Sequence, residues 1–275
     1  MTPGAARGAP KPPAGPGLDE LAKDRQFVTA LARGLEVLRA FQAGGGQLGN
    51  QEIARRTNLP KPTVSRLTHT LTRLGYLVHD ERIGKYRTGP GVLALGQSSL
   101  MNMGLLRVAR PYMQELRAYS HASIAIATRD RLEIVYLENI SGDASIGLRL
   151  EAGARLPMGT TAAGRAYLAA LPEGERAFLM GHLEKLHRAR WPGVRDGIAR
   201  AVDEIATRGY TVVAGEWQRE VAAVGAPIVV PGGLGLAVMT AGAPSFVIGR
   251  ARLEREVGPR LASFVQAIET ELENA

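Results

Sequence analysis

The first regular pattern in the chain is an amphipathic helix over residues 27–42, FVTALARGLEVLRAFQ. Its apolar positions are three or four residues apart, which is the spacing of one face of a helix. These positions are Phe27, Leu31, Leu35, Leu38 and Phe41. The glycine-rich GGGQLG ends this helix. NQEIARRT then predicts a short second helix with Asn50 as its N-cap and Glu52 in its positively polarised first turn.

A third helix is predicted after the turn NLP, with Pro62 in its first turn, where a missing N–H is tolerated. Its apolar stripe consists of Val64, Leu67, Leu71 and Leu74. The opposite face combines arginine and histidine with short hydroxyl side chains, and no acidic residue occurs between Lys61 and His79. This face suits the major groove of DNA, because arginine binds guanine edges with two hydrogen bonds and hydroxyl groups reach phosphates or bases. The candidate DNA-contacting residues of this helix are Lys61, Pro62, Thr63, Ser65, Arg66, His69 and Arg73.

Two short strand-like runs, YLVHD and KYRTG, follow the third helix and are joined by a turn through ERIG. Three helices followed by a basic hairpin predict a winged helix-turn-helix domain. In its wing, Arg82, Lys85 and Arg87 can reach the DNA backbone or the minor groove. The alternative is a small helical bundle whose hairpin touches no DNA.

The net charge of +8 is concentrated in this part of the chain. Residues 20–90 contain 12 basic and 6 acidic residues, whereas residues 91–275 contain 20 basic and 19 acidic residues. A basic region beside a nearly neutral one predicts a polyanionic partner for the first region only. A basic surface that is merely solvated is the alternative.

From residue 122 onward the pattern changes from helical to strand-like. Residues 90–122 predict linking helices, the second beginning at Pro111, that can pack against another chain. The predicted strands are ASIAIATRD, RLEIVYLENI, ASIGLRLEAG, TVVAGE, AAVGAPIVV and LGLAVMTAG, the last two joined by a turn at PGGL. A helix is predicted in LPMGTTAAGRAYLAALP, with Thr160 or Thr161 as its N-cap. Further helices are predicted over 173–187, 195–208 and 245–273. Strand runs interrupted by helices predict an α+β domain.

The composition limits the class of protein. A chain of 275 residues with 45% hydrophobic residues is long enough for two globular domains. The lack of cysteine excludes disulfides and thiolate chemistry. No apolar run is long enough to span a membrane and no signal-peptide core is present, so we expect a cytoplasmic protein without a membrane partner. The Pro- and Gly-rich residues 1–19 predict a disordered tail.

Several stretches resemble the IclR family of bacterial transcription regulators, over roughly residues 26–272. They are FVTALARGLEVLRAF, EIARRTNLPKPTVSRLTHTLTRLGYL, KYRTGPGVLALG, LPMGTTAAGRAYLA, GYTVVAGEW and AAVGAPIVV. The resemblance implies a winged helix-turn-helix domain over 20–90, linker helices that dimerise over 91–121, and a GAF-like antiparallel α/β effector-binding domain over 122–275. It also implies a homodimer or homotetramer that represses or activates transcription from a palindromic double-stranded DNA operator in response to a small organic acid. The first stretch is similar to the branch that regulates aromatic-acid catabolism.

The same resemblance places an effector site in three segments of the second domain. The implied residues are Thr160, Thr161, Ala162 and Ala163 at a helix start, Val213 and Glu216 in VVAGE, and Ala223, Met239 and Thr240 in paired strands. The first group suits a carboxylate, because small residues leave backbone N–H groups free at a helix N-terminus, where the dipole favours an anion. Alternatively, a threonine only caps the helix and the small residues permit close packing.

Two positions depart from the usual family pattern. Gly159 stands where many members carry histidine, and Trp217 and Gln218 replace more acidic residues. Trp217 favours a flatter or bulkier ligand, or else is a core or lid aromatic residue.

No catalytic apparatus is visible in the sequence. It contains no nucleophile elbow, P-loop or dinucleotide-binding fingerprint. His182 and His187 are five residues apart rather than the three or four expected of two metal ligands on a helix. We therefore expect no metal, no cofactor and no enzymatic activity. Two alternatives to a ligand-responsive regulator stay open: a ligand-independent architectural DNA-binding protein, and an enzyme that its winged domain only regulates.

Overall fold

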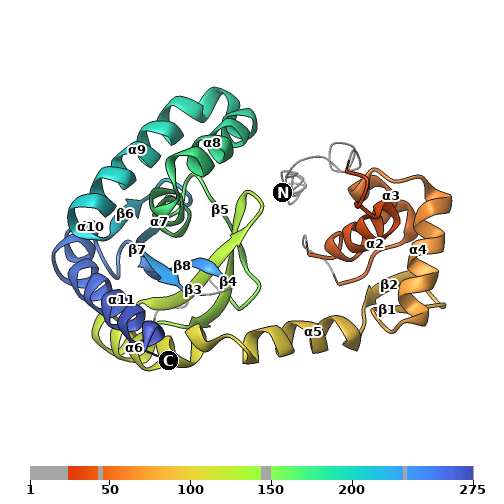
Figure 1. Ribbon diagram of the computed structural model, residues 1–275, viewed down its shortest axis with the longest axis horizontal. Coiled ribbons are helices and arrows are strands. Elements are labelled where there is room, and N and C mark those ends of the chain that lie inside the picture. The colour runs from red at the N-terminus through yellow and green to blue at the C-terminus, as the bar shows by residue number, and fades with distance from the viewer. Residues whose placement is uncertain (1–23, 43–45, 144–149, 232–233, 275) are drawn as a thin grey trace, which may run out of the picture. The chain divides into compact units, whose positions relative to one another are not determined.

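The computed structural model describes residues 24–42, 46–143, 150–231 and 234–274 (Figure 1). The chain forms two compact units, unit 1 within Met1–Asn102 and unit 2 within Met103–Ala275, each with its own hydrophobic core. The predicted tail, residues 1–19, lies outside the described residues. The predicted linker, residues 91–121, is divided between the two units, because its second helix packs into unit 2.

In its described part, unit 1 consists of three helices, a hairpin and a fourth helix. These are α2 (Thr29–Arg39), α3 (Asn50–Thr57), α4 (Lys61–Arg73), β1 (Leu77–Asp80), β2 (Lys85–Thr88) and α5 (Pro90–Met101). Strands β1 and β2 pair antiparallel. The core side chains Val37, Leu48, Ile53, Val64 and Leu77 are at most 2% exposed. The predicted winged helix-turn-helix order is confirmed.

Two details predicted for the helices of unit 1 are wrong. Gly49 rather than Asn50 is the N-cap of α3, and the Asn50 side chain instead accepts a hydrogen bond from Thr68 Oγ1 at 3.1 Å. Leu31 and Leu35 belong to the predicted apolar face of α2, yet they are 62% and 52% exposed. They stay exposed because the face of α2 that packs on the core is centred on Val37.

The linker region is interrupted at Asn102 and Met103, and the helix start predicted at Pro111 is wrong. Helix α6 runs over Gly104–Ser120 with Pro111 inside it. Pro111 is tolerated there because it lies on the exposed side of α6, so the carbonyl group that loses its N–H partner can be solvated. The opposite side of α6 is buried in unit 2 through Leu105, Leu106, Val108, Ala109, Met113, Leu116 and Ser120.

Unit 2 is built on a six-stranded antiparallel sheet in the order β5-β4-β3-β8-β7-β6. The strands are β3 (Ser123–Asp130), β4 (Glu133–Ile140), β5 (Arg155–Pro157), β6 (Thr211–Ala214), β7 (Val221–Val230) and β8 (Gly235–Pro244). Part of the predicted strand ASIGLRLEAG, residues 144–149, lies outside the described residues, as do two residues of PGGL, 232–233. The described remainder of ASIGLRLEAG is not a strand, and the short β5 follows it.

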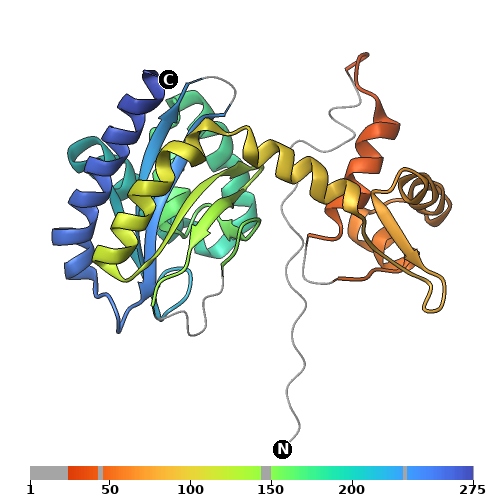
Figure 2. The same cartoon turned by 90° about the horizontal axis from the view of Figure 1, so that it is seen from below.

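Helices cover both faces of this sheet (Figures 1 and 2). Helices α7 (Ala162–Ala170), α8 (Glu173–His187) and α9 (Trp191–Arg208) lie on one side, with α7 packed on β7 and β8. Helices α6 and α11 (Gly258–Glu273) lie on the other side, packed on β3 and β7. The long helix predicted over 245–273 begins only at α10 (Arg250–Arg252) and continues through a π-helical turn, Leu253–Val257. The α+β class is confirmed.

Candidate functional site

Helix α4 presents the predicted polar residues on one exposed face. Lys61, Pro62, Ser65, Arg66, His69 and Arg73 are exposed, and Thr63 is half-buried at the edge of the face. The orientation of α4 is fixed by Val64 and Thr68 on its opposite face, both of which are fully buried. Thr68 Oγ1 donates to Ser65 O and to Asn50 Oδ1, both at 3.1 Å, and the second bond links α4 to α3. Local helical periodicity thus gathers all the predicted α4 residues on one side.

The hairpin β1–β2 carries the three predicted wing residues, Arg82, Lys85 and Arg87, all exposed. The hairpin is anchored to the rest of unit 1 by Tyr86, whose backbone N–H and carbonyl groups both bond Leu48 at 2.9 Å. The Tyr86 ring stacks on His79 at 4.4 Å between ring centroids. The stacked ring of His79 thereby belongs to the framework of the wing.

No described residue neutralises the positive charges of α4 and the wing through an ion pair. Across the described residues, no ion pair is formed by Arg66, Arg73, Arg82, Lys85 or Arg87. On α3, by contrast, Glu52 lies 2.7 Å from Arg56, a pair within one helix. Unpaired, exposed guanidinium and ammonium groups on a helix face and a wing are the arrangement that contacts DNA phosphates and base edges.

In unit 2, the start of α7 approaches the sheet closely. Thr161 is the N-cap: its Oγ1 accepts from Gly164 N at 3.1 Å and donates to Pro157 O at 2.7 Å. A Cβ atom on Gly164 would lie 2.1 Å from Met158 O, and one on Gly225 would lie 2.8 Å from Ala162 O. Glycine at position 164 is therefore required for the loop at Met158 to pack against α7. Glycine at position 225 is required for the start of α7 to pack against β7.

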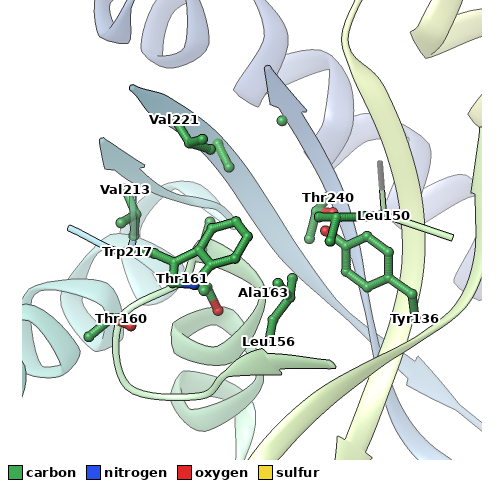
Figure 3. A pocket seen from close by; sticks show the side chains of 13 residues that line it. Tyr136, Leu150, Leu156, Thr160, Thr161, Ala163, Val213, Trp217, Val221 and Thr240 are labelled. Carbon is green, nitrogen blue, oxygen red and sulfur yellow. The ribbon is translucent and has the colours of Figure 1, made fainter. Parts of the chain in front are cut away.

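A small cavity of about 40 Å³ lies between the start of α7 and the sheet (Figure 3). Seven of the nine predicted effector residues line it: Thr160, Thr161, Ala162, Ala163, Val213, Ala223 and Thr240. It is also lined by Tyr136, Leu150, Leu156, Trp217, Val221 and Gly242. Among the described lining residues the only ionisable group is the phenol of Tyr136, and the polarised N–H groups at the start of α7 supply positive potential to the cavity.

Met239 and Glu216, the other two predicted effector residues, do not line the cavity. Met239 is fully buried, and it faces the opposite side of the sheet from Thr240 because successive residues of a strand alternate. Glu216 is paired instead with Arg165: its Oε1 accepts from Arg165 Nη1 at 2.9 Å, and its Oε2 also contacts this guanidinium.

The carboxyl group of Glu216 is held in its ionised form. Burial acts to raise its pKa, but the hydrogen bonds to Arg165 and the charges of Arg165, Arg200 and Arg250 outweigh this effect. The pKa of Glu216 therefore lies below its usual value.

Most of the cavity-lining residues that were not predicted from the sequence lie on strands or short loops. Residues two positions apart in a strand face the same side of the sheet. This alternation could have placed Gly242 on the same face of β8 as Thr240, and Tyr136 on the same face of β4 as Ile134. Leu150 and Leu156 carry no such signal, because Leu150 lies in a loop and β5 is only three residues long.

The described residues contain no group of three or more His, Cys, Asp or Glu side chains that could hold a metal ion. His182 Nδ1 lies 3.0 Å from Phe178 O, while His187 Nε2 is buried without a hydrogen-bond partner. Of the helices in the described part, none combines the length and apolar character needed to cross a membrane.

Comparisons with known proteins identify the family of both units. Residues 30–81 match the IclR helix-turn-helix domain, and residues 97–269 match the C-terminal domain of bacterial IclR transcriptional regulators. The HTH-type transcriptional regulator TsaQ1/TsaQ2 of Comamonas testosteroni is 37% identical over 251 residues, which is 90% of each chain.

Two solved structures extend this likeness to the fold. An IclR family transcriptional regulator from Brucella abortus has 47% identity and a TM-score of 0.84, covering 91% of this chain and 95% of its own. An IclR homologue from Microbacterium hydrocarbonoxydans, solved in complex with 4-hydroxybenzoate, shares the fold at 22% identity and a TM-score of 0.68, covering 90% of this chain and 100% of its own. The chain belongs to the IclR family and is a transcriptional regulator rather than an enzyme.

Proposed function

We propose that this regulator binds a palindromic DNA operator through α4 and the wing, and that a small organic acid in the cavity beside α7 controls this binding. The observation that carries the proposal is the cavity itself. The N–H groups of Ala162 and Ala163 are in the first turn of α7, where no intrahelical partner exists for them, and the surrounding lining is mainly apolar. Such a site favours a carboxylate attached to an apolar body.

An aromatic acid is the class of ligand that best suits the lining. Trp217 and Tyr136 lie on either side of Ala163 in the view of Figure 3, with Val213 and Leu156 also facing the space. Flat rings pack well against such aromatic and branched side chains. The Microbacterium homologue of the same fold was solved with 4-hydroxybenzoate, which makes that acid the natural first probe.

A homodimer or homotetramer is supported by the apolar surface of unit 1. Helix α5 buries none of its residues, and Leu93, Leu95 and Met101 are 65%, 61% and 80% exposed. Leu31 and Leu35 of α2 are also exposed. Apolar surface of this extent is typical of a protein interface, and a twofold dimer matches the symmetry of a palindromic operator.

The test is a thermal-shift measurement on the intact chain with 4-hydroxybenzoate, benzoate and cyclohexanecarboxylate, with phenol as the probe that lacks a carboxylate. A ligand at about 100 times its Kd adds about 2.7 kcal/mol to stability. For a unit of this size the melting temperature then rises by about 5–10 °C. We expect the aromatic acids to raise it and phenol to leave it unchanged. Equal curves with all four probes would contradict the effector assignment.

A ligand-independent architectural DNA-binding protein is the second candidate, and the size of the cavity is the observation that favours it. A volume of about 40 Å³ holds only a few water molecules, so an acid must widen it to enter. DNA affinity of the intact chain, measured with and without 4-hydroxybenzoate, separates the candidates: the sensor changes its affinity and the architectural protein does not.

A further inference from the structure

Arg165 of α7 is the one charged residue in the buried core among the residues that the structure describes, with its side chain only 3% exposed. Burying a guanidinium group is costly unless its donors are satisfied. Arg165 meets this condition with two acceptor groups on two different loops. Its Nε donates to Gly159 O at 3.1 Å, Nη1 donates to Glu216 Oε1 at 2.9 Å, and Nη2 donates to Glu216 Oε2.

Both loops that Arg165 holds contribute to the wall of the cavity. Gly159 is followed by Thr160, and Glu216 is followed by Trp217, and both following residues line the cavity (Figure 3). We propose that Arg165 is a positioning residue that sets the separation of Thr160 and Trp217 and thereby the shape of the effector site. This inference rests on the proposed function where it concerns effector binding, while its geometric part stands without a ligand.

Neighbouring residues pack closely around the Arg165 side chain and around the Gly159 loop that it binds. A Cβ atom on Gly197 of α9 would lie 2.1 Å from Arg165 Nη2, so a larger residue at this position would displace the guanidinium group from its present place. The Gly159 loop is confined from the other side: a Cβ atom there would lie 2.8 Å from Val194 Cγ1 and 3.0 Å from His187 Nε2. The Gly159 loop therefore lies between Arg165 and the side chains of α8 and α9.

Arginine is required for this role by geometry as well as by charge. A planar guanidinium group presents several donors in a fixed plane, so it can bind a carboxylate with two bonds and a carbonyl group with a third. A lysine ammonium group keeps the charge but is a single point on a flexible stem. Arg165→Lys should therefore preserve much of the electrostatic attraction to Glu216 while losing the simultaneous hold on both loops.

The experiment uses Trp217 as its own reporter. The chain has two tryptophans, so Trp191→Phe leaves Trp217 as the only one in the intact protein. In this background we would compare Arg165→Lys and Arg165→Met with Arg260→Met. Arg260 is a matched control, since it is partly buried and pairs with Glu115 at 2.6 Å between α11 and α6, on the other side of the sheet.

Without any ligand, we expect acrylamide quenching of Trp217 to rise about twofold in both Arg165 variants, because its loop is no longer held, and to stay at the background value in Arg260→Met. Far-UV circular dichroism and DNA binding identify the variants that keep the fold. If Arg165→Met unfolds, Arg165→Met/Glu216→Gln removes the unpaired charge and gives the same readout. Background quenching in a folded Arg165 variant would overturn the proposal.

A second arm measures 4-hydroxybenzoate binding in the same set. We expect about tenfold weaker binding in Arg165→Lys, because a loosened site loses its preorganised contacts, and unchanged binding in Arg260→Met. Equal binding in Arg165→Lys and the background protein would overturn the role in effector recognition. Absence of binding in every variant, together with a rise in Trp217 quenching, would contradict the proposed function and support the positioning role of Arg165.

Discussion

Tyr136 on β4 and Thr240 on β8 line the same wall of the cavity, although strand β3 separates their two strands (Figure 3). Tyr136 and Val238 both pair with Ala127 of β3, which puts the three residues in one row of the sheet, next to the row of Thr240. The small side chain of Ala127 leaves room for the Tyr136 ring to cross β3. The aromatic ring of Tyr136 therefore forms part of the cavity wall beside Thr240 (Figure 3).

Tyr136→Phe should destabilise unit 2 modestly. The substitution removes a buried phenolic hydroxyl group that interacts with the side chain of Thr240, a residue that is only 3% exposed. The expected loss is about 1 kcal/mol, or about 2–4 °C in melting temperature for a unit of this size. Calorimetry of the intact chain measures it, with Tyr119→Phe as a control for a partly exposed tyrosine. An unchanged melting temperature would contradict a stabilising interaction between Tyr136 and Thr240.

The sequence predicted the α4 face and the α7 cap well, because both depend on local geometry. Helical periodicity alone places Ser65, Arg66 and His69 on one side of α4. A threonine before a run of small helix-forming residues limits the N-cap of α7 to Thr160 or Thr161, and the structure shows that it is Thr161.

What the sequence could not predict depends on contacts between distant residues. Arg165 and Glu216 are 51 positions apart, and no local pattern pairs them, so the sequence does not reveal that Glu216 is the counter-ion of Arg165. Tyr136 meets Thr240 only because the strand order is β4-β3-β8, which alternation cannot reveal. The sequence predicts that a helix starts at Pro111, whereas Pro111 lies inside α6. It is tolerated there because it lies on the exposed side of the helix, and tertiary packing decides which side that is.

Ala162→Pro should weaken effector binding without unfolding α7. Proline is tolerated at the first position of a helix, and the preceding Thr161 already has the extended backbone that proline requires, with φ −112° and ψ 154°. The substitution removes one N–H donor from the cavity. Loss of a hydrogen bond to a carboxylate corresponds to about tenfold or more in affinity. Calorimetric titration with 4-hydroxybenzoate measures it, and equal affinity would exclude this N–H group as a ligand contact.

Arg66→Ala should relax sequence preference at one base pair of the operator. Arg66 is exposed at the centre of the α4 face and has no ion-pair partner among the described residues. A bidentate contact with guanine contributes about 1–3 kcal/mol of discrimination. Selection from a randomised DNA library, followed by titration, checks the change. The exposed Arg195→Ala of unit 2 serves as the control, and an unaltered preference in Arg66→Ala would remove this residue from the base contacts.

Lys85→Ala should weaken DNA binding equally for all sequences. Lys85 lies at the start of β2, where an exposed ammonium group can reach a phosphate. Loss of one phosphate contact lowers the slope of log K against log salt concentration by about 1 and leaves specificity unchanged. Titrations at several salt concentrations measure the slope, with Lys185→Ala in α8 as the matched control. A wild-type slope in Lys85→Ala would place this part of the wing away from DNA.

The ion pair of Glu216 and Arg165 should make stability depend on pH in the acidic range. The pKa of Glu216 is lowered in the folded state, so its ionised form is the one that the fold favours. The resulting stabilisation is fully present above the unfolded pKa of about 4.3 and is lost as the pH falls through the folded value. Melting temperatures of the wild type and Glu216→Gln should therefore differ at neutral pH and converge below about pH 4. The carboxyl group is ionised throughout the neutral range, so a gap that closes between pH 6 and 8 would point to a different titrating group.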